Sequence, residues 1–188
     1  MSIEKITQLI DQGQEKLTGY QGSISSDHAY IHKGIAFTAF IDLGTISAVT
    51  RIGFKTPSVA SGEYVHWRPL GISTSTAYVK AVLTEGDTYT GGTASPAVNR
   101  NRNLAATKLT NMQDFKKGVT STPSGTVIAL AGLGSAGNPF SRSGGGSGAD
   151  EEILLIPNTN YVLSLTPGAS TAVLLRLFWY EEEEGYTA

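Results

Sequence analysis

The residues able to do acid–base, nucleophilic or metal chemistry are few in this sequence. Three histidines occur, His28, His32 and His66, and there is no cysteine, which excludes disulfides, thiolate metal sites and a cysteine nucleophile. His28 and His32 are four residues apart, but the segment HAYIH leads into a strand pattern and lacks the glutamate of a metalloprotease motif. We therefore predict no metal ligand. The open alternative is a metal site in an extended segment, where residues four apart also share a face.

Three other sequences have the composition of catalytic motifs without their context. GGGSG at 144–148 lacks the strand and helix that present a serine nucleophile. GLGSAG at 132–137 precedes no helical pattern of the kind that a dinucleotide site requires. The adjacent glutamates at 181–184 repel one another, so we expect a solvated strand end, or an acidic tail that meets a basic partner. We predict no catalytic residue, no cofactor and no enzyme activity; a glycosidase or a cupin-like oxygenase is the enzymatic alternative.

The composition favours a single β-rich domain. The chain has 188 residues, of which 40% are hydrophobic and only 16% charged, with 22 glycines and 7 prolines. This suits many short elements joined by tight turns better than a helical bundle. The net charge of −2 gives no general attraction for nucleic acid. We see no apolar run of about 20 residues and no signal-peptide pattern, and we expect a chain made in the cytoplasm that binds no membrane.

Period-two hydrophobic patterns predict strands from residue 35 onward. One parity is apolar in TISAVTRIGF (45–54), in EYVHWRPL (63–70) and in STAYVKAVLTEG (75–86), and GTVIAL (125–130) adds a further strand. The runs EEILLIP, NYVLSLTP and STAVLLRLFWYEE follow, separated by Pro-Asn and Pro-Gly turns. The last run is apolar on both parities, so we expect a central strand covered on both faces. About eight short strands predict an antiparallel β-sandwich, most simply a jelly roll, with another Greek-key order as the alternative.

Three segments outside these strands are candidates for contact with partners. Residues 1–30 are predicted to form a helix at 3–12 and an arm that packs on its own domain or docks on a neighbour, through Ile3, Ile6, Leu9 and Ile10. The sandwich at 31–188 carries predicted long loops at 85–120 and 131–150. The second, rich in glycine, contains Phe140 and Arg142. In the first, Arg100 and Arg102 either bind partner carboxylates or, with Asn99 and Asn101, tie down their own loop.

The order of several short motifs resembles a family of small virion proteins of tailed bacteriophages, the head decoration or cement proteins. The resembling pieces, spread over residues 28–181, are HKGIAFTAF, FKTPS, YVHWRPL, VLTEGDTYTGGT, VNRNRN, EEILLIPNTNYVLSLTPG and LRLFWYEE. The resemblance covers about four-fifths of the chain and excludes the N-terminal helix and the glycine-rich loop.

The resemblance implies a jelly-roll-like subunit, often trimeric, that binds the major capsid protein on the outside of an icosahedral shell. We therefore expect a homotrimer located on the virion and made in the host bacterium. A bridging subunit stabilises a shell through many modest contacts replicated over a lattice. The alternative is a receptor- or carbohydrate-binding module of a head fibre or tail. Such a module would group exposed aromatic side chains, for which the candidates are Tyr64, Tyr78, Tyr89 and Tyr186.

Overall fold

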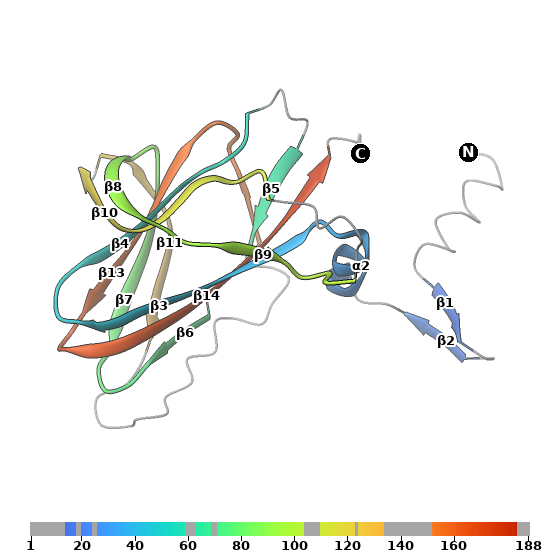
Figure 1. Cartoon of the computed structure of the whole chain (residues 1–188), viewed down its shortest axis with the longest axis horizontal. Coiled ribbons are helices and arrows are strands. Elements are labelled where there is room, and N and C mark those ends of the chain that lie inside the picture. The colour runs from blue at the N-terminus through green and yellow to red at the C-terminus, as the bar shows by residue number, and fades with distance from the viewer. Residues whose placement is uncertain are drawn as a thin grey trace.

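The described part of the chain consists mainly of antiparallel strands with one short helix (Figure 1). A computed structural model describes residues 14–17, 20–23, 26–58, 63–68, 71–103, 110–122, 124–133 and 152–183. In chain order the elements are β1 (Gln14–Leu17), β2 (Tyr20–Ser23), α2 (Ser26–Lys33), β3 (Ala36–Ile46), β4 (Thr50–Lys55), β5 (Glu63–Trp67), β6 (Gly71–Thr74), β7 (Val79–Glu85), β8 (Thr88–Ala94), β9 (Ala97–Asn99), β10 (Gln113–Thr122), β11 (Thr126–Leu133), β12 (Ile153–Leu155), β13 (Asn160–Pro167) and β14 (Thr171–Glu183).

The larger strands form two sheets that face each other. One sheet has the order β11-β7-β13-β4-β10-β8, and the other has the order β12-β5-β14-β3-β9, with β6 pairing along β14. Every pairing between these strands is antiparallel. The hairpin of β1 and β2 lies apart from the sheets, while α2 lies at one end of the sandwich (Figure 1). The predicted antiparallel β-sandwich is therefore confirmed.

The strand pairing is nested in the manner of a jelly roll. β3 pairs with β14, β4 with β13, β5 with β12 and β7 with β11, so the outermost strands pair together and the innermost strands pair together. Successive pairs of this series alternate between the two sheets. A long hairpin folded over in this way gives the two Greek keys of a jelly roll. β8 and β10 extend one sheet beyond β4, and β9 extends the other beyond β3.

Stacked aromatic rings fill the space between the sheets. The ring of Phe54 on β4 lies 4.9 Å from that of Trp67 on β5 and 5.4 Å from that of Tyr161 on β13. Phe115 on β10 stacks at 5.8 Å against Trp179 on β14, which belongs to the opposite sheet. All five side chains are buried. Because aromatic side chains bury large apolar areas, this stack supplies much of the contact between the sheets.

The residues that alternate along β5 and β7 face the core as predicted. Val65, Trp67, Val79 and Leu83 are buried, whereas His66 between them is only partly covered. The strand predicted at 125–130 exists and continues to Leu133 as β11. The Pro-Asn turn before β13 is also present. There Asn158 adopts a positive φ of 52°, a conformation that asparagine tolerates better than most residues.

Four predictions about local structure were wrong. The run 45–54 is not one strand, because Ser47 and Ala48 turn the chain from β3 in one sheet to β4 in the other. The long loop predicted at 85–120 contains β8, β9 and most of β10. The polar segment around His28 and His32 forms α2, so the boundary predicted at residue 30 falls inside a helix. The outer face of β14 is only partly covered, since Leu174 is 54% exposed.

An aspartate ties the β7–β8 turn to the start of β11. The carboxylate of Asp87 is buried and accepts hydrogen bonds from the backbone N–H of Ser124 at 2.7 Å and of Gly125 at 2.6 Å. The hydroxyl of Thr84 donates a third bond at 2.5 Å. Burial raises the pKa of Asp87, but these three bonds and the charge of Arg51 outweigh burial and hold it below its ordinary value.

Candidate interaction surface

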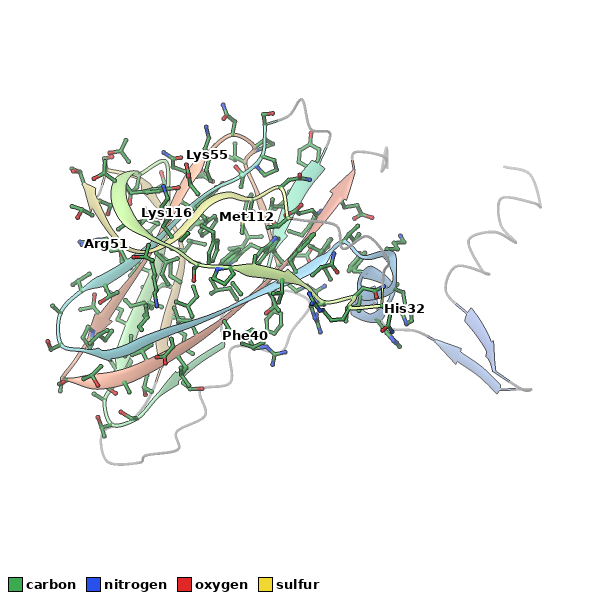
Figure 2. The ribbon with its side chains drawn as sticks, in the orientation of Figure 1. His32, Phe40, Arg51, Lys55, Met112 and Lys116 are labelled. Atoms are coloured by element: carbon green, nitrogen blue, oxygen red, sulfur yellow. The ribbon has the colours of Figure 1, made fainter. Side chains whose placement is uncertain are left out.

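The outer face of the β14 sheet carries apolar and arginine side chains that the core does not use. Register pairs Phe40 on β3 with Arg176 on β14, and Thr38 with Phe178. Phe40, which Figure 2 labels, projects from β3. Its side chain is 61% exposed, and that of Leu174 is 54% exposed. Val98 on the edge strand β9 pairs with Thr38 and is also exposed. We call this set the outer strip: Phe40, Val98, Leu174, Arg176 and Phe178.

Arginines lie over the aromatic rings of the outer strip. The guanidinium carbon of Arg176 is 4.3 Å from the ring centroid of Phe178 and 5.4 Å from that of Phe40. The guanidinium carbon of Arg100 lies 5.2 Å from the centroid of the Phe178 ring. These distances allow cation–π attraction, and an exposed guanidinium such as that of Arg176 offers planar donors that pair readily with carboxylates.

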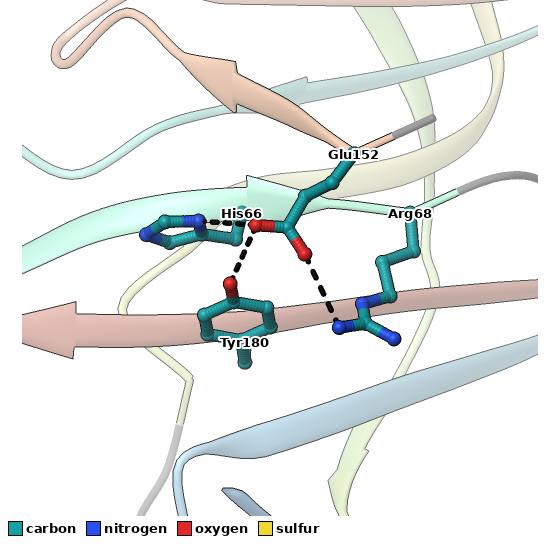
Figure 3. Close-up of polar contacts among 4 residues, drawn as sticks. All are labelled: His66, Arg68, Glu152 and Tyr180. Atoms are coloured by element: carbon teal, nitrogen blue, oxygen red, sulfur yellow. Dashed lines mark hydrogen bonds and ion pairs between the residues drawn. The ribbon is translucent and has the colours of Figure 1, made fainter. Parts of the chain in front are cut away.

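A polar cluster around Glu152 lies farther along the same face (Figure 3). One carboxylate oxygen, Oε1, lies 2.8 Å from Nδ1 of His66 and accepts a hydrogen bond of 2.5 Å from the hydroxyl of Tyr180. The other oxygen, Oε2, is 3.2 Å from Nη2 of Arg68. We call these four residues the Glu152 cluster. It joins the residue before β12 to β5 and β14, so it ties three strands together at the sheet surface.

The charges in the Glu152 cluster favour an ionised glutamate beside a protonated tyrosine. Burial raises the pKa of Glu152, but hydrogen bonds from Tyr180 and His66 and the charge of Arg68 outweigh it, so this pKa is below its ordinary value. Burial and the bond to Glu152 raise the pKa of Tyr180 far above its ordinary value. Glu152 therefore binds the side chains of the three other residues of the cluster, which suits a rigid surface.

Helix α2 covers this end of the sheet. The ring of Tyr30 stacks on that of Tyr180 at 4.1 Å, and His66 stacks on the other side at 4.2 Å. The C-terminal end of α2 is held by two asparagines: Nδ2 of Asn99 donates to the carbonyl of Gly34 at 2.6 Å, and Nδ2 of Asn101 donates to that of His32 at 3.1 Å.

The structure locates only two of the residues predicted to bind partners. Arg100 lies over the Phe178 ring of the outer strip, and Arg102 is exposed in the turn that follows β9. The predicted helix at 3–12 and the six other residues lie outside the described residues: Ile3, Ile6, Leu9, Ile10, Phe140 and Arg142. In the segment 99–102, Asn99 and Asn101 hold their own loop and the end of α2 through hydrogen bonds to the backbone. Arg100 lies over the Phe178 ring on the outer face of the sheet.

The glutamate run contains the largest error of the sequence interpretation. Glu181 was expected to be solvated, but it is fully buried and its carboxylate accepts hydrogen bonds from the backbone N–H groups of Asn111 and Met112. The sequence interpretation also missed the Glu152 cluster. The sequence did contain a signal for it. His66 and Arg68 alternate with the core residues of β5 and so face away from the core, and Tyr180 has the same relation to Trp179 on β14.

Comparison with known proteins returns no relative. No family model matches the chain, and neither a curated protein nor a solved structure does. Among the described residues no group of three or more acidic or histidine side chains is placed to hold a metal ion. No helix within the described ranges is long and apolar enough to cross a bilayer.

Proposed function

We propose that the chain is a non-enzymatic structural subunit of a tailed-phage particle. It binds the outside of the capsid and braces the shell by bridging capsid subunits. The sequence resemblance to cement proteins supports this proposal, and the jelly-roll order is compatible with it. Because jelly rolls also host lectins and enzymes, the fold alone does not decide the function.

The observation that carries the proposal is the outer strip. Its exposed Phe40 and Leu174 lie within one sheet face, with Arg176 between the two phenylalanines. Arginine and aromatic side chains are enriched among the residues that dominate binding energy at protein interfaces. The partner that this chemistry fits is a protein surface that offers carboxylates beside an apolar patch. We assign that role to the major capsid protein.

The rigidity of the surface suits a bridging role. β14, which carries three of the five residues of the outer strip, is the central strand of its sheet and pairs with β3, β5 and β6. The Glu152 cluster and α2 hold the far end of the same face. A preorganised surface loses less conformational entropy on binding, and repetition over a closed lattice adds avidity.

The proposal is tested by mass determination followed by sedimentation with undecorated phage shells. We expect a homotrimer that pellets with the shells. We expect the substitution Leu174→Glu to weaken retention by about tenfold or more, because losing a central interface contact costs at least about 1.4 kcal/mol. The matched control is Thr90→Glu, which adds the same charge to the exposed edge strand β8 of the other sheet.

Each outcome separates one part of the proposal from the others. A chain that never pellets with shells would overturn the capsid-binding function and lead to a glycan-array screen for the carbohydrate-binding alternative. Equal retention of Leu174→Glu and Thr90→Glu would exclude the outer strip as the docking surface. Of the tyrosines named as candidates for a glycan site, Tyr89 packs over Gly53 of β4, whereas Tyr78 packs over Gly132 of β11 and is 46% exposed.

A further inference from the structure

Helix α2 carries two histidines whose rings face each other. Nε2 of His28 and Nε2 of His32 are 2.9 Å apart, and the ring centroids are separated by 4.5 Å. Both side chains are exposed, and their spacing of four residues places them on one side of the helix. Neither histidine belongs to the outer strip or to the Glu152 cluster, so the proposed function does not account for this pair.

The backbone beneath the two histidines is held in place by the rest of the domain. Tyr30, located between them in sequence, stacks on Tyr180 of the sheet at 4.1 Å. The carbonyl of His32 accepts a hydrogen bond from Asn101 at 3.1 Å. The helix is therefore anchored at both its middle and its end. Two ligands on an anchored backbone lose little further freedom when they bind the same ion.

We propose that His28 and His32 chelate a divalent late transition-metal ion, with Cu(II) and Ni(II) preferred to Zn(II). Imidazole nitrogens bind such ions at about 2.0–2.1 Å. Two bonds of this length at a right angle place the nitrogens about 2.9 Å apart, whereas a tetrahedral angle places them about 3.3 Å apart. The two nitrogens share a hydrogen bond of 2.9 Å, and this separation equals that of neighbouring ligands in a square-planar or octahedral site. Cu(II) and Ni(II) favour this geometry, and Cu(II) stands highest in the affinity order.

A metal ion bound by these two histidines would stabilise helix α2. The ion links two successive turns of α2, so metal binding stabilises the helix that covers Tyr180. The remaining coordination positions face solvent, where water or a donor group from another polypeptide can fill them. This inference does not depend on the phage function and is tested on the isolated chain.

The composition of the chain leaves few other side chains that bind these metal ions strongly. The sequence has no cysteine and only three histidines, so His66 provides an internal control. Purified untagged full-length protein is titrated with Cu(II), Ni(II) and Zn(II) separately, followed by calorimetry and by thermal unfolding. We expect one Cu(II) or Ni(II) ion per chain and a higher Tm with either metal. We expect about 10²-fold weaker binding in His28→Gln and in His32→Gln, since each variant loses the chelate advantage of a second linked ligand.

The control variant and the metal order decide the result. His66→Gln is expected to bind Cu(II) and Ni(II) as the parent chain does. The proposal is overturned if the parent chain binds neither ion, or if the double variant His28→Gln/His32→Gln binds them as well as the parent. Equal loss of binding in His66→Gln would assign the metal to another site. Tighter binding of Zn(II) than of both other ions would overturn the right-angle geometry.

Discussion

The indole Nε1 of Trp179 donates a hydrogen bond to the carboxylate of Glu181, 3.1 Å away and inside the sandwich. The two residues share the inward face of β14, and Glu181 is 0% exposed. Its carboxylate also accepts bonds from the hydroxyl of Thr110 and, at 2.8 Å, from the backbone N–H of Asn111. One buried carboxylate therefore attaches the segment before β10 to the central strand of the opposite sheet.

Replacing this carboxylate is expected to destabilise the fold strongly. Glu181→Ala leaves the donors of Trp179 and Asn111 buried without their acceptor, so we expect the free energy of unfolding to fall by about 3 kcal/mol or more. Urea denaturation followed by tryptophan fluorescence measures this change. The matched control is Glu182→Ala, at a half-buried neighbour, for which a change within about 1 kcal/mol is expected. Similar losses in both variants would contradict the assigned role.

The Glu152 cluster predicts a loss of stability in acid. The pKa of Glu152 in the folded chain is below its ordinary value of 4.5, so the unfolded chain binds this proton more readily. The stabilisation is therefore fully present above about pH 5 and is lost as the pH falls through the folded pKa. Asp87, whose pKa is also lowered, acts in the same direction.

Urea denaturation of the parent chain and of Glu152→Gln at pH 7, 4 and 3 measures this contribution. We expect Glu152→Gln to be less stable than the parent at about pH 7. We also expect it to lose less stability than the parent between about pH 7 and about pH 3. Asp87 remains in the variant, so part of the acid dependence is retained. If Glu152→Gln and the parent chain lost stability equally as the pH falls, the carboxylate of Glu152 would have the same pKa in the folded and unfolded parent chain.

The stacking of Tyr30 on Tyr180 is expected to control the docking of α2. Tyr30→Ala removes a ring that lies 4.1 Å from its partner. We expect amide hydrogen exchange in α2 to accelerate by about tenfold or more, because an aromatic pair contributes about 0.5–1.5 kcal/mol beyond the burial of its area. Tyr30→Phe keeps the ring and is expected to retain most of the protection. Equal exchange rates in both variants would mean that the stack does not anchor the helix.

The edge strand β11 is expected to promote self-association of the isolated chain. Among the described strands β11 pairs with β7 alone, and its sequence TVIALAGL carries no charge. Its side chains Val127 and Leu130 are 57% and 66% exposed. An uncharged apolar edge is a template for pairing with another chain. The other edge of the same sheet, β8, contains Gly91 and Gly92 at positive φ, which disturb its regularity.

Adding a charge to β11 should therefore reduce association. We expect Leu130→Lys to lower concentration-dependent light scattering, with a change in the free energy of unfolding within about 0.5 kcal/mol, because the side chain is exposed. Thr90→Lys on β8 adds the same charge to the opposite edge and is expected to leave the scattering unchanged. Equal effects of the two substitutions would indicate a general effect of charge.

Much of the fold was predictable because strands with one buried face require alternating side chains. The patterns along β5 and β7, the three closing strands and the turn before β13 all follow from this requirement and from local turn chemistry. The surface was harder to predict. Phe40 and Leu174 look like core residues in sequence, and only the absence of a third layer among the described residues leaves them exposed.

The sequence by itself therefore determined the strand content, the parity of the core side chains and the sandwich class, since these depend on neighbours along the chain. The tertiary structure decided the nested pairing, the split of 45–54 between two sheets and the outer strip. It also decided the burial of Glu181, whose donors at Thr110 and Asn111 come from another part of the chain. The reason is physical: a carboxylate is solvated or buried according to the donors that long-range pairing brings to it.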